Sequence, residues 1–186
     1  MKPELTSITG RPLSLAAPDS YAGMGMVALK KIKMIVCDVD GVLTDGRVYF
    51  SDDGRKMKSF CLKDFDACTM FRKLEIPIAF VTGERNKFTE LVQQKLKPEY
   101  FVDGCKNKYN AINEILDGAD IAWSEICYMG DGIYDMEPLK YAGIAVCPAD
   151  AIEEVKDIEG IYILKRSGGT GCLSELFSTL NRNQCL

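Results

Sequence analysis

The sequence predicts an α/β fold, in which a mainly parallel β-sheet is covered by helices on both faces. Three observations support this prediction. Short apolar runs alternate along the chain with longer segments of helical periodicity. Several apolar runs stop abruptly at an acid, a threonine or a glycine, as buried parallel strands commonly do. The length of 186 residues also suits one domain of this kind.

The first 30 residues and the rest of the chain differ in character. Residues 1–30 are rich in Pro, Ser, Gly and Ala without a clear period, so we expect a flexible arm or linker there. Residues 31–182 are expected to form a three-layer, Rossmann-like domain. The expected strands are 33–37, 78–82, 100–102, 125–129, 143–146 and 161–164. The expected helices are 65–75, 85–96, 107–117, 134–141, 150–157 and 171–180.

One segment departs from this alternation. Residues 47–61 contain two short β-prone runs separated by the turn pair Asp53-Gly54, a pattern that predicts a β-hairpin. Because this hairpin directly follows the first strand, we expect it to act as a flap over the carboxyl edge of the sheet or to pair with another subunit.

Composition excludes several classes of function. The chain has no histidine, so Ser-His-Asp catalysis and histidine-ligated metal sites are excluded. The formal charge of −4 argues against nucleic acid or an anionic membrane as a partner. None of the eight cysteines forms a C-x-x-C pair, and we expect Cys37, Cys127 and Cys147 to be core residues of a protein in a reducing compartment. Without a run long enough to span a membrane, we expect a cytoplasmic protein.

Two acids mark the end of the first expected strand. Asp38 and Asp40 are separated by one residue, so in a continuing strand both side chains would face the same side and Val39 would face the core. Asp38 is a candidate nucleophile, and Asp40 is a candidate general acid and base. The alternative is an ordinary pair of turn aspartates before Gly41.

Three later strand ends carry further polar groups. Thr82-Gly83 follows the second strand, where the threonine either binds a phosphoryl oxygen or caps the helix expected near residue 85. Lys108 opens a helix and either holds a phosphate or is an ordinary solvated lysine. Asp131 and Asp135 follow Gly130 and, with Asp38 and Asp40, offer the oxygen ligands of a magnesium site. Because two carboxylates about 5 Å apart repel by roughly 3 kcal/mol, a bound divalent cation is favoured.

In this order, D-x-D, Thr, Lys and G-D-x-x-x-D resemble the motifs of the haloacid dehalogenase-like phosphohydrolases, across residues 33–146. The resemblance implies a magnesium-dependent phosphomonoesterase in which Asp38 forms an aspartyl phosphate. A closer resemblance, extending to the tail at 167–172, is to the small sugar-phosphate phosphatases that lack a cap domain. These include 3-deoxy-D-manno-octulosonate 8-phosphate phosphatase and relatives acting on nonulosonate 9-phosphates. The resemblance implies a small acidic sugar phosphate as substrate and a homotetramer.

Some positions depart from the closer family. The chain has Glu84 followed by Arg85 where the family usually has arginine directly after Thr82-Gly83, Gly132 where a second aspartate is common, and Thr170 in place of an arginine. With Lys63 in place of another arginine, Lys63 and Arg85 are candidate substrate-binding residues. These departures concern substrate contacts rather than the phosphoryl-transfer residues.

Two other functions remain open from the sequence. The domain resembles the non-catalytic oligomerisation domain of some acylneuraminate cytidylyltransferases, although such a domain has no need for clustered acids. A mutase or dehalogenase on the same scaffold would usually need an inserted cap domain, for which this chain has no room.

Overall fold

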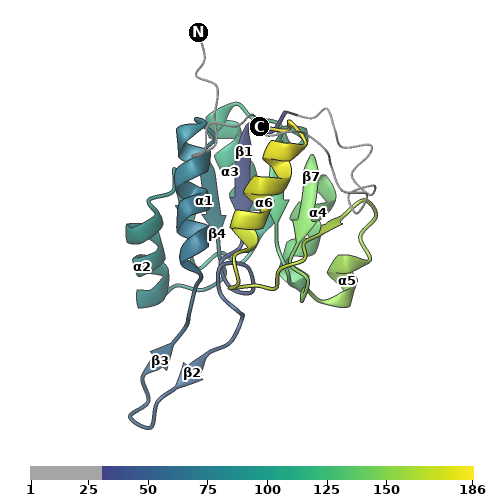
Figure 1. Ribbon diagram of the computed structural model, residues 1–186. Helices are drawn as coiled ribbons and strands as arrows, with labels where there is room; N and C mark the ends of the chain where they lie inside the picture. Colours follow the sequence, from purple (N-terminus) through teal and green to yellow (C-terminus); the bar gives the residue numbers. More distant parts are fainter. Residues whose placement is uncertain (1–30) are drawn as a thin grey trace, which may run out of the picture.

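The computed structural model describes residues 31–186, and the arm expected over residues 1–30 lies outside them. Six parallel strands form one sheet in the order β5-β4-β1-β6-β7-β8, which confirms the predicted α/β fold (Figure 1). The strands are β1 (Met34–Cys37), β4 (Ile78–Val81), β5 (Tyr100–Val102), β6 (Ile126–Met129), β7 (Ile144–Cys147) and β8 (Tyr162–Ile163). The first and last residue of every one of these strands lie within one residue of the predicted bounds.

Helices cover both faces of the sheet. One face carries α1 (Leu62–Lys73), α2 (Lys87–Leu96) and α6 (Cys172–Arg182). The other carries α3 (Lys108–Ala119), α4 (Met136–Tyr141) and α5 (Glu153–Lys156), with the 3-10 turns η2 (Trp123–Glu125) and η3 (Ile133–Asp135) in the connections. α1 starts three residues before its predicted beginning, because its first turn has no capping side chain that would mark the start in the sequence.

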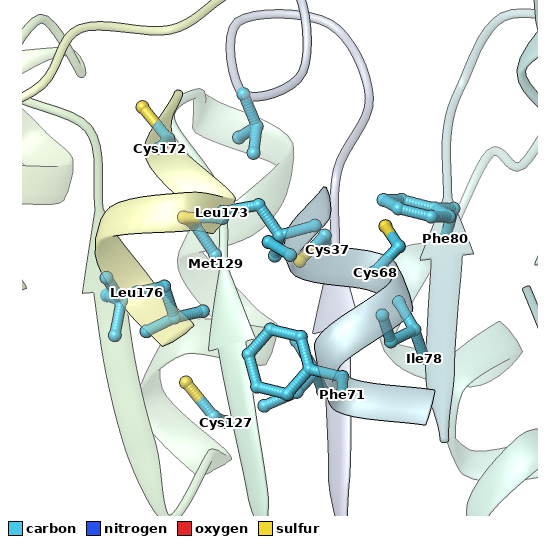
Figure 2. Packing of buried hydrophobic residues seen from close by; sticks show 14 of the residues in the cluster. Cys37, Cys68, Phe71, Ile78, Phe80, Cys127, Met129, Cys172, Leu173 and Leu176 are labelled. Carbon is cyan, nitrogen blue, oxygen red and sulfur yellow. The ribbon is translucent and has the colours of Figure 1, made fainter. Parts of the chain in front are cut away.

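The central strands are buried on both faces. In β1, Met34 and Val36 pack against α3 and α4, whereas Ile35 and Cys37 pack against α1 and α6. Figure 2 shows the second of these clusters, where the ring of Phe71 lies among Cys37, Cys127 and the leucines of α6. Cys37, Cys127 and Cys147 are all fully buried, as predicted for core residues.

The predicted hairpin is present. β2 (Tyr49–Phe50) pairs with β3 (Lys56–Met57) in antiparallel register, and Gly54 supplies the turn with a φ of +78°. Figure 1 shows the hairpin projecting away from the body of the domain. Its apolar side chains are exposed, Phe50 by 66% and Met57 by 57%. Within residues 31–186, no helix has the length and apolar character needed to cross a lipid bilayer.

Candidate active site

One cavity lies where the predicted strand ends meet. Because β1, β4, β5 and β6 are adjacent and parallel, the loops at their carboxyl ends share one edge of the sheet. The cavity has a volume of about 510 Å³. Its lining includes five of the predicted site residues, namely Asp38, Asp40, Thr82, Gly83 and Lys108.

Lys108 is the central cation of this cavity. Its ammonium lies 2.6 Å from Asp38 Oδ2 and 2.7 Å from Asp135 Oδ1, and only 6% of the side chain is exposed. The alternative of a solvated lysine is therefore wrong. Burial by itself would lower the pKa of Lys108, but the carboxylates of Asp38 and Asp135 raise it above its usual value, so the ammonium stays charged.

Asp135 is fixed by four hydrogen bonds. Its Oδ1 accepts from Lys108 and from the hydroxyl of Tyr128, at 2.7 and 2.5 Å. Its Oδ2 accepts from the backbone N–H groups of Asp131 and Gly132, both at 3.0 Å. With both oxygens engaged in this way, Asp135 is better suited to orienting its neighbours than to giving up an oxygen to a metal ion.

Asp38, Asp131 and Asp135 form an acidic cluster. Each offers a carboxylate oxygen, and these three oxygens lie within 4.8 Å of one another. The side chain of Asp40 is not part of this cluster. Oxygen donors at this spacing suit a hard divalent cation such as magnesium. The donor set therefore fits the metal that the sequence predicts, with Asp38 and Asp131 as the more available ligands.

The three carboxylates of the cluster exceed the positive charge of Lys108, the cation paired with two of them. Burial and the nearby Asp135 carboxylate raise the pKa of Asp38 to about 7, although Lys108 opposes this. The same two causes raise the pKa of Asp131 to about 7. A divalent cation would favour the ionised form of both groups, because it supplies the positive charge that the site lacks.

Asp40 takes a different environment from Asp38. β1 ends at Cys37, so Asp40 lies in the following turn rather than in a continuing strand. Its Oδ1 accepts from Lys58 Nζ at 2.7 Å and from the hydroxyl of Thr44 at 3.2 Å. Val39 is fully buried, and Asp38 and Asp40 both line the cavity. The two acids therefore lie on one side and Val39 faces the core, as expected from their spacing, although the strand has ended.

Thr82 does not cap the following helix. α2 is capped by Asn86, whose side chain accepts from Phe88 and Thr89 in a capping box. The Thr82 hydroxyl instead accepts from the backbone N–H of Glu84 at 3.2 Å, and the residue is 1% exposed at the cavity wall. The capping alternative is therefore wrong, and Thr82 lines the same cavity as Asp38.

Two predicted substrate contacts lie elsewhere. Arg85 is bound to Asp103 through a 2.8 Å ion pair, and neither Arg85 nor Lys63 lines this cavity. Lys58 was not among the predicted site residues. The hairpin brings it to Asp40 and to Glu84, and 9% of its side chain is exposed. It also did not place Lys106 and Tyr134, which line the same cavity.

The glycine-rich tail supports the loop that carries Asp40. The N–H of Gly169 donates to the carbonyl of Val42 at 3.0 Å, and a Cβ on Gly168 would lie 2.1 Å from the carbonyl oxygen of Gly41. The tail therefore needs residues without side chains at 168 and 169 to approach this loop.

Part of the chain matches a known family model, and most of it is similar to characterised proteins. Residues 101–165 match the model of the haloacid dehalogenase-like hydrolases. The chain is similar to the 3-deoxy-D-manno-octulosonate 8-phosphate phosphatase KdsC of Escherichia coli strain B, with 28% identity over 155 residues that cover 83% of this chain and 82% of that protein.

Solved structures agree with this relationship. A 3-deoxy-D-manno-octulosonate 8-phosphate phosphatase from Yersinia pestis superimposes with a TM-score of 0.80 at 26% identity, over 89% of each chain. The cobalt-bound deoxy-D-mannose-octulosonate 8-phosphate phosphatase from Haemophilus influenzae gives a TM-score of 0.77 at 27% identity, over 84% of this chain and 92% of that one. These relatives share the fold and about a quarter of the residues.

Proposed function

We propose that this chain is a haloacid dehalogenase-like phosphatase, and more specifically a magnesium-dependent phosphomonoesterase for a small acidic sugar phosphate. The observation that carries the proposal is the meeting of Asp38, Asp40, Thr82 and Lys108 in one cavity, beside the acidic cluster. Hydrolysis of a phosphate ester needs a nucleophile, a proton donor and positive charge, and these residues supply each of them.

Asp38 is the proposed nucleophile. Its carboxylate attacks phosphorus and forms an aspartyl phosphate, while the bond from phosphorus to the sugar oxygen breaks. Asp40 gives its proton to that leaving oxygen and then takes a proton from the water that hydrolyses the intermediate. Lys108 and the hydroxyl of Thr82 stabilise the negative charge on the equatorial phosphoryl oxygens. The two acids have different partners, since Asp38 is paired with Lys108 and Asp40 with Lys58.

Asp38, Asp131 and the backbone carbonyl of Asp40 are the proposed magnesium ligands, with Asp135 holding Lys108 and the loop of Asp131. When bound, the ion would neutralise the acids and polarise the phosphoryl group. The cobalt in the Haemophilus influenzae relative supports a divalent metal in this family.

The substrate proposal rests on the relatives named above. Their substrate is a 3-deoxy sugar acid phosphate, so we propose 3-deoxy-D-manno-octulosonate 8-phosphate or a nonulosonate 9-phosphate for this chain. The open cavity with Lys58 and Lys106 on its wall is compatible with an anionic substrate. Lys63 and Arg85 would contact that substrate only if a neighbouring subunit completes the site.

We propose a homotetramer in the cytoplasm. The exposed apolar side chains of the hairpin, Phe50 and Met57 among them, support contact with another subunit. All eight cysteines lie within the described residues and none is in a disulfide, which suits a reducing compartment. Size-exclusion chromatography with light scattering tests the subunit number, and a monomer at micromolar concentration would contradict it.

Phosphate release is the direct test of the proposed function. The substrates are 3-deoxy-D-manno-octulosonate 8-phosphate, two nonulosonate 9-phosphates and 4-nitrophenyl phosphate, each with magnesium and with EDTA. Asp38→Asn should abolish turnover, whereas Asp117→Asn, an exposed aspartate on α3 outside the cavity, should not change it. Turnover that persists in Asp38→Asn or in EDTA would contradict the mechanism.

A further inference from the structure

Asp150 is an exposed residue of the loop after β7 and does not line the cavity. Beyond the ends of β7 and β8, this loop runs beside the glycine-rich tail, and the N–H of Ala149 donates to the carbonyl of Arg166 at 3.0 Å. The next contact uses a side chain, because Asp150 Oδ1 accepts from the N–H of Gly168 at 2.8 Å. Asp150 therefore attaches the loop after β7 to the tail.

The loop after β7 is also bound to Asp131, one of the proposed magnesium ligands. The N–H of Ile152, two residues after Asp150, donates to the backbone carbonyl of Asp131 at 3.0 Å. The charge of Asp150 reaches the same residue: burial and Asp135 are the main causes of the raised pKa of Asp131, and Asp150 adds to them. Asp150 is thus connected to Asp131 by a backbone contact and by its charge.

On its other side the tail contacts the loop after β1. The N–H of Gly169 donates to the carbonyl of Val42 at 3.0 Å, and Gly168 lies so close to Gly41 that a Cβ would be 2.1 Å from its carbonyl oxygen. Gly41 directly follows Asp40, whose backbone carbonyl is another proposed magnesium ligand. The position of the tail therefore sets the position of the loop that offers this carbonyl.

We propose that Asp150 is a positioning residue of the magnesium site, which fixes the loop of Asp40 against the loop of Asp131 by holding the N–H of Gly168. The inference rests on the proposed function, because it concerns the metal that this function requires. Asp150 acts through the tail and needs no contact with the ion. Without its hydrogen bond, the tail and the loop of Asp40 are free to shift relative to Asp131, so the ligands are no longer held at the spacing that the ion needs.

Two substitutions separate the hydrogen bond of Asp150 from its charge. Asp150→Asn keeps an oxygen that can accept from Gly168 but removes the charge, whereas Asp150→Ala removes both. Isothermal titration calorimetry with Mg²⁺ on the metal-free protein measures binding without any substrate. Asp150→Ala should raise the dissociation constant of Mg²⁺ at least about tenfold. Asp150→Asn should raise it less than about threefold, because the charge is exposed. The magnesium concentration that gives half-maximal hydrolysis of 4-nitrophenyl phosphate should rise in the same proportion.

The matched control is Asp157→Ala, which removes an exposed acid just after α5 that does not line the cavity and should leave the dissociation constant unchanged. Thermal unfolding in EDTA should have nearly the same midpoint in wild type and Asp150→Ala, and a large fall would make Asp150 a residue of the fold and overturn the inference.

The remaining outcomes separate this inference from the proposed function. If Asp150→Asn and Asp150→Ala weaken magnesium binding equally, Asp150 acts by its charge and the inference is wrong. If Asp150→Ala binds magnesium as tightly as a wild-type protein that turns over, the inference fails and the proposed function stands. If the folded wild-type protein neither binds magnesium nor hydrolyses any phosphate ester, the proposed function fails, and the inference fails with it.

Discussion

Replacing Lys108 by methionine is expected to destabilise the metal-free protein by about 3–5 kcal/mol at pH 8. The side chain is 6% exposed and its ammonium is the cation of two buried ion pairs, with Asp38 at 2.6 Å and Asp135 at 2.7 Å. Methionine keeps most of the volume but leaves both carboxylates without this cation. Since the free energy of unfolding of a typical domain is about 5–15 kcal/mol, this loss is a large part of the total stability.

The loss should depend on pH. The pKa of Asp38 is already raised to about 7, chiefly by burial, and without Lys108 it should rise further. At pH 6 the acid can take up a proton and avoid an unpaired buried charge, so the variant should lose less stability at pH 6 than at pH 8. Above pH 7 the wild-type protein keeps the charge of Lys108, because its pKa is raised.

Urea unfolding in EDTA at pH 6 and pH 8 measures both effects. Since 1 kcal/mol corresponds to about 2–4 °C, the midpoint temperature of thermal unfolding should fall by roughly 6–20 °C at pH 8. Lys106→Met is the matched control, because Lys106 lines the same cavity but is exposed, and it should change stability by less than about 0.5 kcal/mol. A loss below about 1 kcal/mol in Lys108→Met, or the same loss at both pH values, would refute the reasoning.

Three further predictions follow from other parts of the structure. Burial raises the pKa of Asp64 to about 6, above its value in the unfolded chain, so the free energy of unfolding should fall by up to about 3 kcal/mol as pH rises from 4 to 6 because of this group. Asp64→Asn should flatten that part of the plot of unfolding free energy against pH, and an unchanged plot would contradict the prediction. Asn86→Ala removes the capping box of α2 and should cost about 1–2 kcal/mol in urea unfolding, with a loss under 0.3 kcal/mol arguing against the cap. Gly168→Ala should lower kcat for 4-nitrophenyl phosphate at least tenfold, because the added Cβ would lie 2.1 Å from the carbonyl oxygen of Gly41 and displace the loop that carries Asp40. An unchanged kcat would show that the tail can move away from this loop.

The sheet and its polar edge could be predicted because both depend on local patterns. Each central strand is a short apolar run buried on both faces. The runs of β1 and β4 are followed directly by Asp38 and Thr82, and Asp131 follows the run of β6 after one glycine. Parallel strands bring those ends to one edge, so the meeting of Asp38, Thr82 and Lys108 follows from the fold class. The end of β1 at Cys37 did not matter for this, because Asp40 lines the cavity from the next turn.

Lys58 could not be predicted by the same reasoning. It lies 18 residues after Asp40, and no period relates the two positions. The hairpin register gives the missing signal, since Tyr49 pairs with Met57 and the base closes where Thr44 pairs with Phe60. A residue shortly before that closure returns to the loop after β1. Contacts between helices that are distant in the chain have no comparable signal in the sequence. An example is Asp64, whose carboxylate accepts from the N–H of Ser174 at the start of α6.

The glycines beside the acids have a role that turn chemistry alone does not explain. A Cβ on Gly41 would lie 2.0 Å from Asp131 Oδ2, and a Cβ on Gly130 would lie 2.3 Å from Asp135 Cγ. Of these two glycines, Gly41 has a positive φ, at +78°, and Gly130 does not, so at Gly130 the requirement is the space taken by the Asp135 carboxylate. Each glycine thus makes room for an acid of the cluster, and this is why acid and glycine recur together at two strand ends: three carboxylates can reach one another within 4.8 Å only if the neighbouring backbone carries no side chain.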